Sequence, residues 1–351
     1  MCTSPGVMRQ NVALAGRLFV AVGAVLFSLT SAIVSAAPPS AALDLPRGLY
    51  CSCPPTTAQG SRSVLPAVAR LPYVDGILVR VSWADLAPAS GVYRWELLDR
   101  ELAQAQEYGK KVALAVVNGP AAPAWLATQG AQRFTYRFRD RTAAMPVPWD
   151  GVYLAAWSDF IKRLGERYRD RKEIAVVHIT HASLNGFEMQ LPLSPADRAA
   201  WQSVGYSERR LLASWKSVID AFAQAFPRTA VDVDVHPVLG ADAVAQAVAE
   251  YGRQRIGTRF GLFAGWWSER NTQVYAGMYA LIKRSAATHF ATAQLAHSYT
   301  RMPASFGAGG LAATIDLALA DGVRYLEIWN DDLLNPALGA LLHDTSARLH
   351  R

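Results

Sequence analysis

The chain has 351 residues, of which 51% are hydrophobic and 18% are charged, with three cysteines and a net charge of +7 at pH 7. This composition is typical of a globular protein that folds on its own hydrophobic core, and it excludes a disordered chain or a disulfide-rich small domain. The basic excess is mild and contains no runs of Lys or Arg, so we expect no nucleic-acid partner.

The first 37 residues have the pattern of a secretory signal peptide. Arg9 and Arg17 precede an apolar run from Leu18 to Val34, and the segment ends in small residues without containing an acid. A run of this length can also serve as an uncleaved membrane anchor, which the sequence leaves open. Without residues 1–37 the net charge is +5. We expect the remainder to be periplasmic or extracellular, with no further membrane-spanning segment.

A Pro- and Ala-rich linker over residues 38–47 is followed by short β-branched runs that alternate with longer helical patterns. Eight strands are predicted: Gly48–Cys51, Gly76–Val81, Lys111–Val117, Ile174–Thr180, Ala230–His236, Arg259–Ala264, Phe290–Leu295 and Val323–Trp329. Eight strand–helix units predict an α/β fold, a single (β/α)8 TIM barrel over residues 48–351. An open doubly wound sheet is the alternative, although no Gly-rich phosphate loop follows the first strand.

Cys51 and Cys53 are the cysteines that lie beyond the leader. The single intervening residue would make a bridge between them a tight ring, so the pair forms either a labile disulfide or two thiols. The fold must therefore rest on its core rather than on a disulfide framework.

In a (β/α)8 barrel, functional residues follow the C-terminal ends of the strands. Five of the ten tryptophans are predicted at such ends, where indole faces could stack on sugar rings. Polar side chains lie beside them. The candidate substrate-binding residues are Arg80, Trp83, Asn118, Trp125, His181, Asn185, His236, Trp266, Trp267, Gln294, His297, Trp329 and Asp331. The alternative interpretation of the tryptophans is core packing.

Two glutamates are candidates for glycoside cleavage, which needs one carboxyl group to protonate the departing oxygen and a second to attack the anomeric carbon or activate water. Glu188 follows the fourth predicted strand, and Glu327 lies in the eighth. Both have apolar and aromatic neighbours, which would raise a carboxyl pKa. The alternatives are a solvated loop position for Glu188 and an exposed strand face for Glu327.

Arg80 lies inside the second predicted strand, where a buried guanidinium should be paired with a carboxylate. Either it orients a catalytic carboxylate or it forms a structural ion pair. Asp232, Asp234 and His236 share one strand face by their spacing of two. A metal site built from them lacks any H-x-H or H-x-x-x-H spacing. We therefore expect neither a metal nor a cofactor, and no G-x-S-x-G motif indicates a serine nucleophile.

The N-terminal half resembles retaining glycoside hydrolases of the large (β/α)8 clan, the cellulase-like family 5 and the β-galactosidase-like family 42. The resemblance lies in Gly76–Trp83, in Pro88 through Gly91–Trp95, in Gly109–Leu114 and in Pro123–Leu126. It implies that Arg80 contacts the nucleophile. In that clan the acid/base Glu directly follows an Asn, whereas Asn185 and Glu188 are three apart. The clan's nucleophile ends the seventh strand, where this chain has Gln294.

These patterns predict a secreted or periplasmic glycoside hydrolase that cleaves a poly- or oligosaccharide by carboxylic acid/carboxylate catalysis. Glu188 would be the general acid/base and Glu327 the nucleophile or an electrostatic partner. The alternative is a non-catalytic carbohydrate-binding TIM barrel, favoured by Gln294 in the usual nucleophile position. The sugar, the stereochemical outcome and the oligomeric state stay open.

Overall fold

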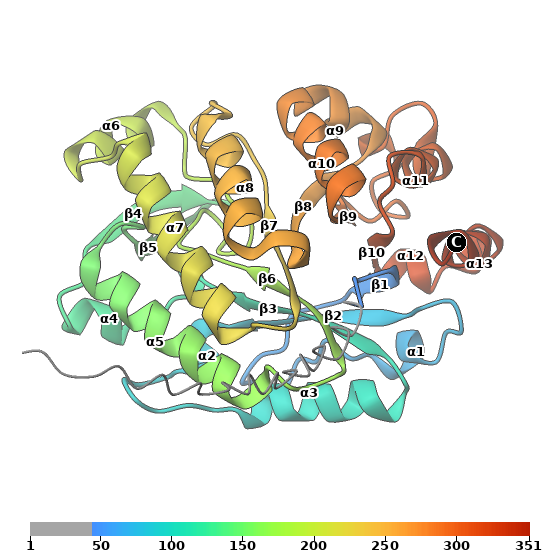
Figure 1. Cartoon of the computed structure of the whole chain (residues 1–351), viewed down its shortest axis with the longest axis horizontal. Coiled ribbons are helices and arrows are strands. Elements are labelled where there is room, and N and C mark those ends of the chain that lie inside the picture. The colour runs from blue at the N-terminus through green and yellow to red at the C-terminus, as the bar shows by residue number, and fades with distance from the viewer. Residues whose placement is uncertain (1–43) are drawn as a thin grey trace, which may run out of the picture. The chain divides into compact units, whose positions relative to one another are not determined.

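The computed structural model describes residues 44–351, so the predicted leader and most of the linker lie outside the described residues. Figure 1 shows the arrangement of its helices and strands. The strands are β1 (Gly48–Ser52), β2 (Gly76–Ser82), β3 (Lys111–Val117), β4 (Arg133–Phe138), β5 (Arg141–Pro146), β6 (Ile174–Ile179), β7 (Ala230–Asp234), β8 (Phe260–Trp267), β9 (Ala291–Leu295) and β10 (Tyr325–Trp329).

Helices follow the barrel strands, and several of the connecting loops carry an additional short helix. Their bounds are α1 (Pro66–Ala69), α2 (Trp83–Leu86), α3 (Glu96–Glu107), α4 (Trp125–Thr128), α5 (Gly151–Tyr168), α6 (Pro195–Ser203), α7 (Glu208–Ala225), α8 (Ala243–Ile256), α9 (Glu269–Val274), α10 (Ala276–Thr288), α11 (Gly310–Ala320), α12 (Asn330–Leu333) and α13 (Gly339–Leu349). Short 3-10 turns are η1 (Gly119–Ala121), η2 (Gly257–Arg259), η3 (Pro303–Ser305) and η4 (Pro336–Leu338).

The sheet closes into a barrel in the order β1-β10-β9-β8-β7-β6-β3-β2. All of these pairings are parallel, and closure occurs where Gly48 of β1 pairs with Tyr325 of β10 and Ser52 pairs with Trp329. The predicted (β/α)8 barrel is confirmed, and the open doubly wound sheet is excluded because the first and last strands pair. All eight predicted strands are present, with ends shifted by at most three residues.

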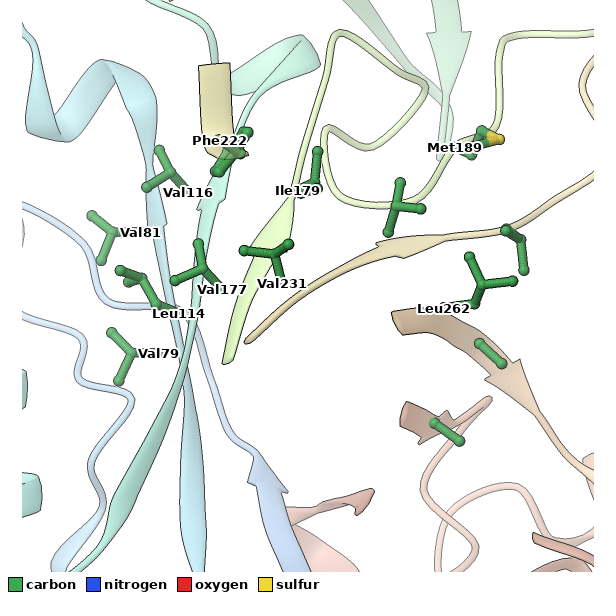
Figure 2. Packing of buried hydrophobic residues seen from close by; sticks show 14 of the residues in the cluster. Val79, Val81, Leu114, Val116, Val177, Ile179, Met189, Phe222, Val231 and Leu262 are labelled. Atoms are coloured by element: carbon green, nitrogen blue, oxygen red, sulfur yellow. The ribbon is translucent and has the colours of Figure 1, made fainter. Parts of the chain in front are cut away.

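Alternate residues of the strands pack into two separate apolar layers. The layer between strands and helices includes Val79, Leu114, Val177 and Val231, which Figure 2 shows in close packing. A second layer fills the inside of the barrel, and its buried members include Tyr50, Leu78, Ala115, Val176, Phe263 and Tyr325. This parity decides which side chains of a strand face the interior of the barrel.

Helix α5 shows how the sequence sets the outer shell. The side chain of Asp150 accepts a hydrogen bond from the backbone N–H of Tyr153 and caps the first turn. Trp157, Phe160, Ile161 and Leu164 form its buried face. Gly165 lets the helix approach α7, because a Cβ at this position would meet the backbone of Ala225 at 2.5 Å.

The hairpin β4–β5 is an element that our sequence-based assignment lacks. Its strands pair from Arg133 opposite Pro146 to Phe138 opposite Arg141. Arg139 and Asp140 connect them, both with positive φ, as a two-residue type I′ turn requires. Phe134 stacks on Trp201 of α6 at a centroid distance of 3.5 Å. Tyr136 donates a hydrogen bond to the carbonyl of Leu184, so the hairpin supports the loop that carries Glu188.

One stretch beyond the leader has the length and composition of a membrane-spanning segment. Pro303–Ala320 is long and apolar enough, by length and composition, to cross a membrane. In the structure this stretch forms η3 and α11, and Leu311, Ile315 and Ala318 are buried in the outer core of the barrel. Of the two states left open for the cysteines, the structure contains the disulfide between Cys51 and Cys53.

Candidate active site

Glu188 lies in the loop after β6, at the C-terminal rim of the barrel. The side-chain oxygen of Asn185 accepts hydrogen bonds from the backbone N–H groups of Phe187, at 3.0 Å, and Glu188, at 2.9 Å. Gly186 between them has a φ of +78°, and a Cβ there would collide with the backbone of Asn118. The turn fixes the backbone of Glu188, while its side chain keeps 23% of its surface exposed. Asn185, predicted to bind substrate, therefore shapes the loop.

Glu188, His236 and Asp234 form one cluster, which we call the rim triad. His236 Nδ1 lies 2.6 Å from Oδ2 of Asp234, and its Nε2 lies 3.8 Å from Oε2 of Glu188. Oδ2 of Asp234 also accepts the backbone N–H of Met189, at 2.9 Å. Asp234 thereby connects the ring to the loop that carries Glu188.

The rim triad changes the acidity of its members. Burial raises the pKa of the Glu188 carboxyl; the His236 charge opposes this shift and the Asp234 charge adds to it. Burial lowers the pKa of His236, but Asp234 and Glu188 outweigh it, so the net pKa is raised. A carboxyl group with a raised pKa that still reaches solvent is suited to donate a proton.

The end of β8 closes the rim triad from the other side. Gly265 donates its backbone N–H to Oδ1 of Asp234 at 3.1 Å. A Cβ at Gly265 would lie 3.3 Å from Oδ1 of Asp234 and 3.3 Å from Cγ of Glu188, tighter than usual contacts. Trp266 and Tyr275 pack edge-on against the His236 ring. The absence of a side chain at Gly265 therefore leaves space for the carboxylates of Asp234 and Glu188.

Glu327 occupies a deeper layer inside the barrel and is fully buried. Its Oε1 accepts a hydrogen bond from the Tyr325 hydroxyl, and its Oε2 accepts one from Nε2 of Gln294, both at 2.6 Å. The same amide nitrogen of Gln294 also donates to the Ser52 hydroxyl at 3.0 Å. The Glu327 carboxylate is therefore held at both oxygens, by Tyr325 of its own strand β10 and by Gln294 of the neighbouring strand β9.

His178 of β6 lies between Glu327 and Asp232. Its Nδ1 is 2.6 Å from Oδ1 of Asp232, and its Nε2 is 3.3 Å from Oε1 of Glu327. Thr292 donates a hydrogen bond to the other oxygen of Asp232. Burial lowers the pKa of His178, but the two carboxylates outweigh burial and raise it to about 10. We call Asp232, His178 and Glu327 the inner triad; its histidine is a cation at neutral pH.

Arg80 of β2 is a second cationic side chain in this region, and it is partly buried. Its Nη2 donates to the carbonyl of Cys53 at 2.7 Å, and its guanidinium lies 5.9 Å from the ring centre of Trp329. Burial lowers its pKa, while the charges of Glu327 and Glu188 raise it. The charges of both glutamates therefore act on Arg80, but neither glutamate forms a direct ion pair with it. The direct carboxylate partner that the sequence suggests is absent among the described residues.

The structure gathers five of the predicted site residues around the two glutamates. Arg80, Asn185, His236, Gln294 and Trp329 all lie in the barrel interior or at its rim, in the contacts described above. Trp329 is partly buried and donates its indole N–H to the carbonyl of Leu295. Of the predicted rim tryptophans, it is the one beside Arg80.

Four other predicted contacts lie away from the mouth. Trp83 is fully buried in an outer aromatic cluster with Trp157 and Phe160. Asn118 is buried and bonded to the Tyr153 hydroxyl and to its own loop. His181 lies between that hydroxyl and Ser214, and burial lowers its pKa to about 3. Trp125 faces outward, with its N–H on the Ala87 carbonyl. Trp83, Asn118 and His181 are corrections, because their buried side chains support the shell between strands and helices. Trp125 lies on the outer side of that shell and is partly exposed.

The remaining predicted contacts are divided between core and surface. Trp266 is 4% exposed and Trp267 is 0% exposed, and their N–H groups are bonded to the carbonyls of Val235 and Thr314. Their role is core packing, which corrects the prediction of stacking on sugar. His297 is exposed. Asp331 forms an ion pair with Arg301 at 2.6 Å.

Sequence reasoning did not select His178, Asp232, Asp234 or Tyr325 as site residues. The signal was present, because each is a polar or hydroxyl-bearing residue on the inward-facing positions of a strand otherwise made of apolar residues. Across residues 44–351, no group of three or more His, Cys, Asp or Glu side chains is placed to hold a metal ion.

Residues 74–186 match the model of a glycoside hydrolase family described as beta-galactosidase. This part of the chain is similar to the glycoside hydrolases of that family. The matched segment runs from the start of β2 to the loop before Glu188, and it contains the motifs in which the sequence resembles family 42. Searching curated proteins produced no match.

Solved structures with the same fold include two beta-galactosidases and a xylanase. The enzyme from Marinomonas ef1 is 13% identical, with a TM-score of 0.54 over 81% of this chain and 54% of its own. The enzyme from Rahnella sp. R3 is 14% identical, with a TM-score of 0.53 over 87% and 56%. Xylanase 10B from Thermotoga maritima is 11% identical, with a TM-score of 0.51 over 82% and 83%. This chain spans about half the length of the two beta-galactosidases. At these identities the likenesses establish the barrel fold.

Proposed function

We propose that the protein is an exported glycoside hydrolase that cleaves a poly- or oligosaccharide, with Glu188 as its general acid/base. The observation that carries this proposal is the rim triad. Glu188 is partly exposed at the barrel mouth, its pKa is raised, and His236 backed by Asp234 stands next to its carboxyl group. The family match over residues 74–186 supports glycan cleavage as the reaction class.

In the proposed reaction, protonated Glu188 donates its proton to the glycosidic oxygen as the bond from that oxygen to the anomeric carbon breaks. The carbon develops positive charge, water adds to it, and the proton released by that water returns to Glu188. The net change is addition of water across the glycosidic bond. His236 limits the rise of the Glu188 pKa, so the residue can act both as acid and, after proton transfer, as base.

Glu327 suits an electrostatic role better than that of a nucleophile. The carboxylate is fully buried and both of its oxygens already accept hydrogen bonds. From this position its negative charge can stabilise a cation forming at the mouth, although His178 and Arg80 reduce that field. We therefore assign Glu327 as the electrostatic partner.

Export rests on the leader pattern of residues 1–37, and a neutral or acidic glycan of a cell envelope or plant wall is the proposed substrate class. The mild basic charge of the remainder is compatible with both. The test is release of new reducing ends by residues 38–351 from a panel of such glycans.

The decisive variants are Glu188→Gln and Glu327→Gln, with Glu166→Gln on the outer surface of α5 as the matched control. Loss of a general acid costs about 10²–10⁴ in rate on ordinary glycans. It costs much less on a dinitrophenyl glycoside, whose leaving group needs no proton. Glu327→Gln should lower the cleavage rate of both substrates. Wild-type turnover by both variants on a cleaved glycan would overturn the assignment.

The second candidate is a non-catalytic carbohydrate-binding barrel, favoured by the buried amide of Gln294 at the end of β9 and the complete burial of Glu327. Sugar affinity without reducing-end release over a long incubation would support it. The dinitrophenyl glycoside separates the two candidates most sharply, because a binding module leaves it intact.

A further inference from the structure

A pocket of about 570 Å³ opens outside the barrel mouth, between the loop after α2 and the outer face of α5. Its walls come from Trp83 at the start of α2, from Ala87 to Tyr93, from Trp125 and Gln129, and from Gly151 to Phe160. No residue of the rim triad or the inner triad lines it. The pocket is therefore separate from the proposed active site.

The walls are rich in aromatic rings. Trp125 and Tyr93 are partly exposed, whereas Trp83 and Phe160 are buried beneath them. Trp83 meets Trp125 edge-on at 6.1 Å, and Tyr93 stacks on Trp95 at 5.1 Å. These contacts hold the rings in fixed orientations, so a flat apolar ligand face would meet a preformed surface.

Polar groups line the same pocket. Gln129 donates to the Ser90 hydroxyl at 3.0 Å, and the Tyr93 hydroxyl donates to Asp159 at 3.2 Å. The Nε1 of Trp83 is buried and has no hydrogen-bond partner among the described residues. The Trp83 side chain is fully buried, so the groups that can meet a ligand in this pocket are the neutral amide and hydroxyls of Gln129, Ser90 and Tyr93.

The charge balance of the pocket selects an uncharged ligand. Asp159 is the carboxylate in its lining, and Arg163 lies 3.7 Å from it on the next turn of α5. Neither a cation nor an anion therefore finds an uncompensated partner. Aromatic faces combined with neutral hydrogen-bonding groups match the alternating apolar faces and hydroxyl edges of a sugar.

We propose that this pocket is a second saccharide-binding site, which holds a segment of a neutral oligosaccharide against Trp125 and Tyr93. The loop edge offers room for a chain to continue, because a Cβ at Gly91 or at Gly151 would meet nothing within 4 Å. The proposal requires binding alone and does not depend on catalysis at Glu188.

The test measures binding of unbranched gluco-, xylo- and galacto-oligosaccharides of four units by calorimetry, and retention of the matching polysaccharides in affinity gels. Ala155→Gln places a longer side chain in the pocket from an exposed position on α5, and Lys162→Gln is its control on the same helix. Trp125→Ala removes the aromatic wall. Trp149→Ala is its control, since Trp149 is also partly buried with its N–H on a backbone carbonyl.

Ala155→Gln and Trp125→Ala should each weaken binding at one site at least tenfold, with both controls unchanged and with reducing-end release from a short glycoside unaffected. Binding that resists Ala155→Gln, or the absence of saccharide binding in the whole panel, would overturn the proposal. Stronger binding of tetramethylammonium than of any saccharide would also overturn it, because the pocket would then be a cation site. If no glycan is hydrolysed but saccharide binding is retained and is weakened by Ala155→Gln, only the proposed activity is contradicted.

Discussion

The Nε2 atom of His236 lies 3.8 Å from Oε2 of Glu188, while Asp234 holds the other ring nitrogen at 2.6 Å. The histidine cation therefore opposes the rise in the Glu188 pKa that burial causes. This contact links the pH dependence of the proposed reaction to a side chain that does not itself transfer the proton.

His236→Asn should move the alkaline limb of the pH–rate profile to higher pH. The variant removes the positive charge that lowers the Glu188 pKa and leaves the Asp234 charge, which raises it, uncompensated. Protonated Glu188 then persists to higher pH. The measurement is kcat/KM for glycan cleavage across pH, with the dinitrophenyl glycoside as a control substrate that needs no acid. An alkaline limb that stays in place or moves to lower pH would contradict the assignment of Glu188 as acid.

Gly265→Ala should lower the turnover number while the protein remains folded. The added methyl group would lie 3.3 Å from both Asp234 and Glu188 and must displace one of them. We expect a loss of at least tenfold in kcat, because small misplacements of catalytic groups are costly. Gly339→Ala is the control, since a Cβ at Gly339 meets nothing within 4 Å. Equal activity of the two variants would show that the rim triad tolerates displacement.

Glu327→Gln should destabilise the fold by about 3–5 kcal/mol near pH 6, because the variant leaves the buried His178 cation with one carboxylate instead of two. The folded-state pKa of His178 is raised to about 10. Its contribution to stability is therefore complete below its unfolded value of about 6.5 and is lost as the pH rises toward 10. Denaturant unfolding at pH 6 to 10 should show a smaller decline for the variant than for the wild type. Parallel curves would mean that Glu327 does not raise the pKa of His178.

His181→Gln should make the protein less sensitive to acid. Burial lowers the pKa of His181 to about 3, so the folded state keeps the ring neutral. Its stabilising contribution is present above about pH 6.5 and is lost as the pH falls toward 3, by about 2 kcal/mol between pH 6.5 and pH 5. Unfolding free energies of the variant and the wild type, compared at pH 7 and pH 5, measure this difference. If the gap between them does not change with pH, His181 is protonated in the fold.

The barrel could be predicted from sequence because its eight strands are separated by long helical patterns, and parallel strands buried on both faces are nearly continuous apolar runs. The hairpin β4–β5 was missed for a local reason. Its strand Arg133–Phe138 alternates buried and exposed residues, but its turn uses Arg139 and Asp140 instead of the usual Asn-Gly or Asp-Gly pair.

The site was less predictable because sequence position gives the end of a strand but not the direction of a side chain. Trp83 and Trp329 both stand at strand ends, yet Trp83 turns into the outer shell as the first residue of α2, and Trp329 keeps the inward parity of Glu327. Counting by two from Tyr325 on β10 and from Leu78 on β2 separates the two cases. The same count along β7 placed Asp232 and Asp234 on one face with His236 in the sequence, but it gave the two aspartates no role other than the metal site that was set aside.

Asp232 and Asp234 are neighbours of the same parity on β7, and they belong to the inner triad and the rim triad respectively. Two residues of a strand span about 7 Å. The separation of the two aspartates that hold the histidines is therefore fixed by a rigid strand. The loops around the mouth could therefore be exchanged to change which glycan enters, while Asp232 of the inner triad and Asp234 of the rim triad keep their spacing.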